Sequence, residues 1–226
     1  MNIRKFLLGL SLILSFQICK AQDELDINYD KIKQTIENKE SQYFYQKLLQ
    51  RFNDFDESLT LEEYALIYYG FSFQDNYLKN QPDEKILSEL YKSNEYDKLI
   101  VECKKVLETN PVSLTANDYM GYAHFKLEKP EKEWKKYQNR FRGLRKAIVY
   151  SGNGLTCETS FKVIYVSDEY DILYDYFDVS EIYSQSLTEG LCDKFIIKPS
   201  DYYQVSEIYF DISRKIIRQQ ELIDKK

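Results

Sequence analysis

The spacing of apolar residues changes near residue 148. Before that point, apolar side chains recur every three or four positions, the spacing of one helix face, as at Tyr45, Leu48, Leu49 and Phe52. Beyond it, short runs of β-branched and aromatic residues alternate with polar residues and with turn-forming Gly, Asn, Asp and Pro. The pattern predicts an α+β chain, with a helical region over residues 22–147 and a β-rich region over residues 148–226.

Local signals place the helices of the first region. Thr60 and Glu63 have the spacing of a capping box, and Gly70 suits the residue that follows a helix. An apolar stripe from Tyr96 to Leu107 stops before Pro111, which cannot continue a helix. The expected helical ranges are about 29–52, 60–69, 96–107, 114–127 and 131–146.

Two of these segments carry an internal repeat. Asn94, Asp97 and Lys98 recur 34 residues later as Glu128, Glu131 and Lys132, each time before an amphipathic helix. Pro111 and Gly121 fall where a repeat of this length has a terminator and a small, closely packed residue. The segment resembles a degenerate pair of tetratricopeptide repeats, although two ordinary antiparallel helical hairpins would explain the pattern as well.

The β-rich region predicts a small antiparallel sheet. Its strand-like runs cover residues 161–166, 182–187, 192–197 and 207–212, and residues 170–176 suit a short helix or strand. The connections are short, which favours an antiparallel meander over parallel crossovers. From Arg214 onward, the chain is either a docked helix or a frayed end.

The first residues have the pattern of a cleavable export signal. Arg4 and Lys5 precede an uncharged run from Phe6 to Phe16, and Ala21 offers a small residue at a cleavage point. A run of this length is too short to span a bilayer, which takes about 20 residues. We therefore expect residues 1–21 to be a signal peptide and the mature protein to be periplasmic or extracellular, without a stable membrane span.

The charge balance argues against nucleic acid as a partner. The chain carries a net charge of −6, and removing a leader with three basic and no acidic residues would lower it to −9. Non-specific nucleic-acid binding depends on phosphate neutralisation by Lys and Arg. An acidic protein does not offer it.

Cysteine and histidine usage limits the chemistry. Three cysteines follow the leader, and Cys157 and Cys192 both lie in the β-rich region, where they could form a disulfide in an oxidising compartment. Cys103 falls on an apolar helix stripe, which predicts a buried thiol. With His124 as the only histidine, we expect no metal site and no cofactor.

One segment is basic within this acidic chain. Residues 128–146 hold eight basic and three acidic residues. A basic helix face could bind an acidic protein or peptide partner, whereas a solvated face is the simpler interpretation. The residues expected to bind the partner are Lys136, Arg140, Arg142, Arg145 and Lys146.

Other motifs offer weaker chemistry. Ser151-Gly-Asn-Gly154 could expose amides to an anion, although a tight turn explains it. Asp168 and Glu169 could act as paired carboxylates, but adjacent acidic residues in a turn usually both face solvent. His124 sits on a helix, where a groove or core contact is expected. The aromatic run Tyr64, Tyr68, Tyr69, Phe71, Phe73 and Tyr77 could form a stacking wall or fill the core.

Several short motifs follow one another along the chain, among them Tyr68-Tyr-Gly-Phe71, Ser151-Gly-Asn-Gly154 with Glu158-Thr-Ser-Phe161, Gln185-Ser-Leu187 and Tyr209-Phe-Asp211. In this order they resemble the domain-of-unknown-function 4919 family, which consists of exported proteins typical of Bacteroidota. The resemblance implies a helical N-terminal part joined to a β-rich part in an envelope or extracellular setting. It supplies no catalytic residue.

These observations together favour a non-enzymatic protein- or peptide-interaction module of the cell envelope. A module that binds glycans or small anions is the first alternative, through the aromatic groups or the glycine loop. A hydrolase with an unrecognised carboxylate-based site is the second.

Overall fold

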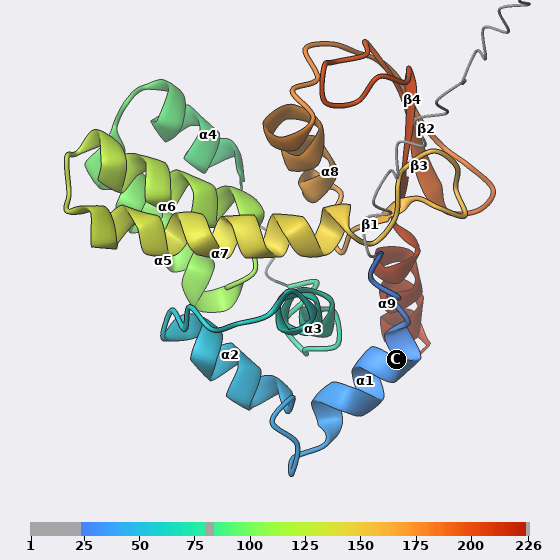
Figure 1. The fold of residues 1–226 in the computed structure, drawn as a ribbon, viewed down its shortest axis with the longest axis horizontal. Coiled ribbons are helices and arrows are strands. Elements are labelled where there is room, and N and C mark those ends of the chain that lie inside the picture. The colour runs from blue at the N-terminus through green and yellow to red at the C-terminus, as the bar shows by residue number, and fades with distance from the viewer. Residues whose placement is uncertain (1–23, 80–83, 225–226) are drawn as a thin grey trace, which may run out of the picture.

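The computed structural model describes residues 24–79 and 84–224, so the leader expected over residues 1–21 lies outside the described residues (Figure 1). The helices are α1 (Tyr29–Glu37), α2 (Tyr45–Asn53), α3 (Leu61–Phe71), α4 (Glu84–Lys92), α5 (Tyr96–Thr109), α6 (Leu114–Lys126), α7 (Glu131–Val149), α8 (Ser167–Asp171), the π-helical turn η1 (Ile172–Tyr176) and α9 (Ser213–Ile223). The strands are β1 (Phe161–Lys162), β2 (Ile182–Leu187), β3 (Cys192–Ile197) and β4 (Glu207–Asp211). The chain is α+β.

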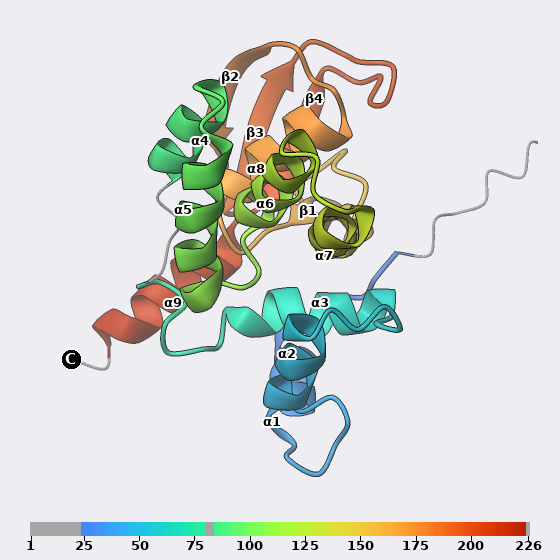
Figure 2. The same ribbon diagram turned by 90° about the vertical axis from the view of Figure 1, so that its left-hand side faces the viewer.

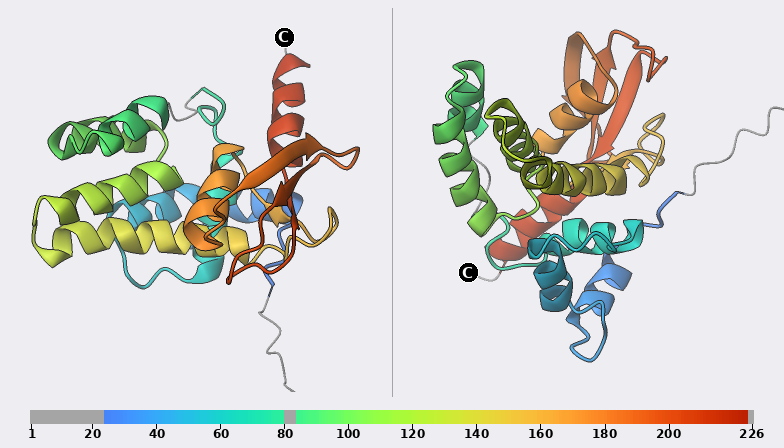
Figure 3. Two further views of the ribbon diagram at one scale, coloured as in Figure 1. Left: turned by 90° about the horizontal axis from the view of Figure 1, so that it is seen from above. Right: turned by 60° about the vertical axis from the view of Figure 1, so that its left-hand side comes forward.

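The elements form two groups that meet along α7. Helices α4 to α7 lie on one side, the sheet lies on the other, and α8 stands between them (Figure 1). The α1–α2 hairpin projects below α3, on the side of α3 away from the sheet (Figure 2). Seen from above, α9 extends away from the sheet toward the C-terminus (Figure 3).

The first helices follow the predicted signals in part. Thr60 and Glu63 form the capping box: Thr60 Oγ1 accepts from the Glu63 amide at 3.2 Å, and Glu63 Oε2 accepts from the Thr60 amide at 2.9 Å. The single helix expected over residues 29–52 is two helices, because the polar stretch between them turns the chain back. Gly70 does not end α3, which continues to Phe71; instead its missing side chain lets the Tyr45 ring approach.

Helices α4 to α7 make two consecutive hairpins with a common geometry. Asn94 and Glu128, 34 residues apart, both take the left-handed conformation at the turn of their hairpin, with φ of 57° and 53°. At Gly121 the backbone of α7 comes so near that an added Cβ would stand 3.3 Å from Trp134 O. The expected small residue therefore lets α6 and α7 pack closely.

The sheet has the order β1-β4-β3-β2. Strands β2, β3 and β4 form the predicted antiparallel meander. The prediction of an all-antiparallel sheet is wrong at β1, which pairs with β4 in parallel through Phe161–Phe210. The reason is that the chain leaves β1 into α8 and η1, which cross over the sheet before β2 begins.

One apolar core joins the helical region to the sheet. Tyrosines fill much of it: Tyr68, Tyr69 and Tyr77 are fully buried, and each hydroxyl has a hydrogen-bond partner. The aromatic run of α3 and the following loop is therefore mainly core, as expected from its helical spacing.

Candidate functional site

Arg140 holds the end of α2 in place. Its Nε and Nη2 donate to Phe52 O at 3.0 and 2.6 Å, and its guanidinium lies 3.5 Å from the centre of the Phe55 ring. A cation at the negative end of a helix is favourable, and here it shares the Phe52 carbonyl with the Phe55 amide, which donates to the same oxygen at 3.1 Å. Burial lowers the pKa of Arg140 to about 10, so the group stays charged at neutral pH. The expectation that Arg140 faces a partner in solvent is wrong.

Two further basic residues of α7 also contact other residues of the same chain. Arg145 donates from Nη1 to Asp175 O at 3.1 Å and lies over the Tyr176 ring. Lys136 forms an ion pair with Glu133 at 2.9 Å. These side chains connect α7 to neighbouring elements or to its own first turns.

Arg142 and Lys146 are the members of the predicted basic face that remain exposed without a partner in the described part of the chain. They lie one turn apart, and Arg142 stands about 200° around the helix from Arg140. The five residues therefore do not share one face. An acidic partner could reach two of them together.

Asp168 and Glu169, expected to face solvent, are both buried. They lie on α8, which packs over the sheet, rather than in an exposed turn. Tyr68 Oη donates to Asp168, and Glu169 stands near Asp193 of β3. Burial, together with the charges of Asp193 and Asp168, raises the pKa of Glu169 to about 10. Glu169 is thus protonated at neutral pH.

This carboxylate cluster does not form an open site. Neither oxygen of Glu169 has a hydrogen-bond partner of good geometry within residues 24–79 and 84–224, and none of the cavities described there is lined by Asp168, Glu169 or Asp193. In the same residues, no group of three or more His, Cys, Asp and Glu side chains could hold a metal ion. The arrangement gives no support to carboxylate-based hydrolysis.

The glycine loop is a structural turn. The amides of Asn153 and Gly154 both donate to Thr159 O, at 2.9 and 2.8 Å, so they are not available to an anion. Gly154 has φ of +70°, which favours glycine, and an added Cβ would stand 2.4 Å from the Phe161 ring. A disulfide joins Cys157, which follows this turn, to Cys192 at the start of β3.

The single histidine and the third cysteine lie inside the helical region. His124 stacks on Tyr137, with ring centres 5.7 Å apart, and burial lowers its pKa. Cys103 is fully buried, and burial raises the pKa of its thiol to about 12. A neutral imidazole and a protonated thiol in these positions give no nucleophile.

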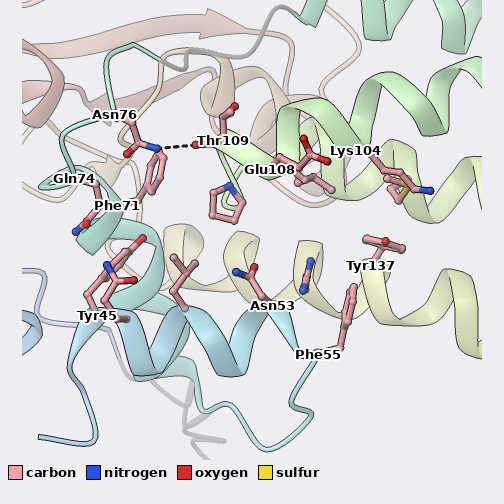
Figure 4. Close-up of a pocket in the computed structure, with 16 residues that line it drawn as sticks. Tyr45, Asn53, Phe55, Phe71, Gln74, Asn76, Lys104, Glu108, Thr109 and Tyr137 are labelled. Atoms are coloured by element: carbon pink, nitrogen blue, oxygen red, sulfur yellow. Dashed lines mark hydrogen bonds between the residues drawn. The ribbon is translucent and has the colours of Figure 1, made fainter.

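A groove between α2 and α5 is a candidate binding site among the described residues. Its volume is about 510 Å³, within the usual range of ligand sites. In Figure 4, Asn53 on α2 points toward the space below α5, where Glu108 and Lys104 lie, while Phe55 and Tyr137 stand at one end. At the other end, Asn76 donates to Thr109 O at 3.0 Å and ties the loop after α3 to α5.

The walls of this α2–α5 groove are rich in side-chain amides. Gln46 and Asn53 are exposed on α2, and neither carboxamide bonds to any other described residue. Lys104 and Glu108 on α5 are exposed and have no ion-pair partner in the same part of the chain. The groove therefore offers two donor–acceptor groups on one wall and one charge of each sign on the other.

The aromatic side chains that line the groove already contact other residues of the chain. Arg140 covers Phe55, His124 covers Tyr137, and the hydroxyl of buried Tyr45 donates to Ile67 O at 3.4 Å. A sugar ring stacks on an exposed aromatic face, and these rings do not offer one.

Sequence reasoning missed the groove because its walls are far apart in the chain. The polar side of α2 reads as an ordinary solvated face, and nothing local indicates that Lys104 and Glu108 stand opposite it. A usable signal was the pair Gln46 and Asn53, two amides two turns apart on one helix.

Comparison with known proteins settles the family. The sequence model of the family described as "Domain of unknown function (DUF4919)" matches residues 30–221. The chain belongs to this family. This DUF4919 chain matches no curated protein and no solved structure. In the portion that the structure describes, it has no helix with the length and apolar character needed to cross a bilayer.

Proposed function

We propose that this DUF4919 chain is an exported, non-enzymatic interaction module whose α2–α5 groove holds an extended segment of another polypeptide. The unpaired carboxamides of Gln46 and Asn53 carry this proposal. A carboxamide has one acceptor and two donors, so it can bond to both the N–H and the C=O of a peptide unit.

The spacing of the two amides fits an extended chain. Gln46 and Asn53 are seven residues apart on α2, which separates them by about 10 Å along the helix. Three residues of an extended strand also advance about 10 Å. Each amide can therefore meet a peptide unit of the same segment. Lys104 and Glu108 on the opposite wall favour a segment that carries charges of both signs.

The alternatives have less support. Glycan binding in the α2–α5 groove lacks an exposed aromatic face, since Phe55 and Tyr137 are covered. Small-anion binding at the glycine loop lacks free amides, and the paired carboxylates Asp168 and Glu169 line none of the described cavities. Of the five basic residues predicted to bind an acidic partner, Arg142 and Lys146 remain exposed, and they could contact parts of the partner that lie beyond the groove.

Export is supported by two observations. The leader-like residues 1–21 have the charge and apolar pattern of a signal peptide. The disulfide between Cys157 and Cys192 is of a kind that persists in oxidising compartments.

Peptide selection tests the groove. A displayed library of random short peptides is selected on the immobilised full chain, and the enriched peptides are resynthesised and titrated. We expect Gln46→Ala with Asn53→Ala to weaken their binding by about tenfold or more. Gln50→Ala, on α2 but outside the groove lining, is the matched control and should leave affinity unchanged.

Two results would overturn the proposal. One is a selection that enriches no peptide. The other is enriched peptides that bind the double variant as well as they bind the wild-type chain. Polysaccharides are titrated in parallel to test the glycan alternative. If a polysaccharide binds the wild-type chain but not the variant with Gln46→Ala and Asn53→Ala, the ligand of the groove is a sugar and not a polypeptide.

A further inference from the structure

Strand β2 forms one edge of the sheet and is unusually exposed. Residues from Tyr183 to Leu187 are all exposed, so neither a helix nor a loop covers the strand on its outer side. The strand has the sequence Ile-Tyr-Ser-Gln-Ser-Leu, without Pro or a charged residue. Natural proteins usually protect such an edge with Pro, Lys or a covering element.

The register shows which backbone groups face outward. Ile197 N donates to Ser206 O, so odd-numbered residues of β3 face β4 and even-numbered residues face β2. Their partners Ser184 and Ser186 accordingly face β3. The N–H and C=O groups of Gln185 and Leu187 point to the other side, where no described residue bonds to them. We call this side of β2 the open edge.

At the opposite edge of the sheet, formed by β1, the outward backbone groups have hydrogen-bond partners. Lys162 and Ile164 face away from β4, since Val163 between them donates to Asp211 O. Ser151 Oγ accepts from Lys162 N, and Tyr69 donates to Lys162 O. Tyr68 accepts from Ile164 N and Tyr77 donates to Ile164 O. All four outward groups are satisfied, and we call this the capped edge.

Apolar side chains accompany the open edge. Tyr183 is 61% exposed and Leu187 is 56% exposed. Because alternate residues of a strand share a face, Leu187 lies on the same face as Gln185, whereas Tyr183 lies where the register shifts between Ile182 and Ser184. The amide of Gln185 donates to Asp193, and its oxygen accepts from Tyr170 of α8. Tyr174 of η1, 49% exposed, stacks on Tyr170. A strand added at this edge would cover Tyr183, Leu187 and Tyr174.

We propose that the open edge of β2 pairs with an extended segment of another protein that carries a basic residue beside Glu189. The backbone groups of Gln185 and Leu187 supply the hydrogen bonds, and the apolar side chains beside them supply buried area. Glu189 follows β2, is exposed and has no ion-pair partner among the described residues, whereas Glu181, which precedes β2, pairs with Lys198 at 3.1 Å.

The same charges argue against a second copy of this chain as the occupant. Two β2 strands paired antiparallel about Gln185 would bring Glu189 of each copy toward Glu181 of the other, whose charge already pairs with Lys198, so Glu189 would gain no basic partner. A Lys or Arg of a foreign segment would give Glu189 that partner.

A designed peptide tests the open edge. The probe alternates Thr and Val, carries Lys at both ends and is long enough to span residues 181–189. Fluorescence anisotropy with the full chain should show saturable binding. We expect Glu in place of both Lys residues to weaken binding by about tenfold.

N-methylation of the probe gives the sharpest control, because the protein stays unaltered. Two variants carry methyl groups on alternate amides, one set in each. An added strand presents only one set to β2, so one variant should lose binding and the other should keep it. On the protein, Leu187→Pro removes an outward N–H, as an edge strand tolerates, and should abolish binding. Gln46→Ala with Asn53→Ala should not affect it.

Three outcomes would overturn this proposal. The probe does not bind; both methylated variants bind like the parent or both fail; or the chain self-associates in sedimentation and Leu187→Pro makes it monomeric, which would identify a second copy as the occupant. Because the groove variant is tested with the same probe, failure at the open edge is distinguishable from failure of the α2–α5 groove.

Discussion

The two edges of the sheet differ in whether their outward backbone groups have hydrogen-bond partners. At the capped edge, tyrosines of α3 and the loop after it cross the core to meet Lys162 and Ile164. At the open edge, Gln185 and Leu187 keep their backbone groups without a partner among the described residues. A buried backbone group without a partner is costly, whereas an exposed one is hydrated until another strand replaces the water.

The contrast extends to the helices. Arg140 donates to the Phe52 carbonyl of α2 on the buried side, while the side-chain amides of Gln46 and Asn53 on the exposed side of the same helix have no described partner. In both regions, the polar groups that face the core have hydrogen-bond partners, and those that face solvent have none among the described residues. We take available groups beside apolar surface as the mark of polypeptide binding in this protein.

Loss of the disulfide should have the largest effect on this arrangement. It connects the loop before β1 to the start of β3, so it links the capped side to the hairpin of the open edge. Closing a loop of 35 residues stabilises by about 4 kcal/mol in the chain-entropy estimate. Cys157→Ser with Cys192→Ser should lower the free energy of unfolding by roughly that amount, measured by urea titration.

Reduction of the wild-type chain is the control for that variant. The reduced chain should match the double serine variant in its denaturation midpoint. Equal midpoints for the oxidised and reduced chains would show that the bridge does not hold the two sides together.

The buried carboxyl of Glu169 on α8 should make stability depend on pH. The folded chain keeps a proton on Glu169 up to a pKa of about 10, whereas the unfolded chain releases it near pH 4.3. The contribution of Glu169 to the free energy of unfolding is therefore complete below about pH 4 and falls as pH rises toward 10. Relative to Glu169→Gln, the wild-type chain should lose about 1 kcal/mol per pH unit between pH 5 and 8.

Urea titrations of both proteins at several pH values give this difference. Subtracting the two curves removes the contributions of all other titrating groups, including Asp118, whose pKa burial raises to about 6. A difference that stays constant between pH 5 and 8 would contradict a proton held on Glu169.

A matched pair of tyrosine substitutions compares the two edges directly. Tyr68→Phe deprives the buried amide of Ile164 and the carboxylate of Asp168 of the same hydroxyl, which should cost about 2 kcal/mol. Tyr183→Phe on the open edge removes an exposed hydroxyl and should change stability by less than about 0.5 kcal/mol. Equal losses in thermal or urea unfolding would remove the distinction between the edges.

Local signals in the sequence carried much of the fold. The capping box at Thr60, the apolar stripe of α5 and the strands β2 to β4 depend on neighbouring residues, and their predicted ranges agree with the structure within a few residues. Helix α4 was missed because its apolar stripe is short. The parallel pairing of β1 was missed because it depends on the path of the chain through α8 and η1.

The site residues were harder to predict because their partners are distant. The partner of Arg140 is 88 residues away, so a basic helix face and a buried helix cap look alike in sequence. The partner of Asp168 is 100 residues away, so a buried carboxylate looks like a turn residue. For Cys157 and Cys192, the expected export of the chain and the position of both residues in the β-rich region suggested a disulfide as one possibility, and the structure contains it.

Amide hydrogen exchange measured by NMR on the dilute, partner-free chain tests the central claim most directly. The amides of Lys162 and Ile164 should exchange slowly, because Ser151 and Tyr68 accept from them. Along β2, Ser186 should be protected by β3, whereas Gln185 and Leu187 should exchange at nearly the rate of an unstructured peptide. Protection of Gln185 and Leu187 equal to that of Ser186 would contradict an edge left open for another polypeptide.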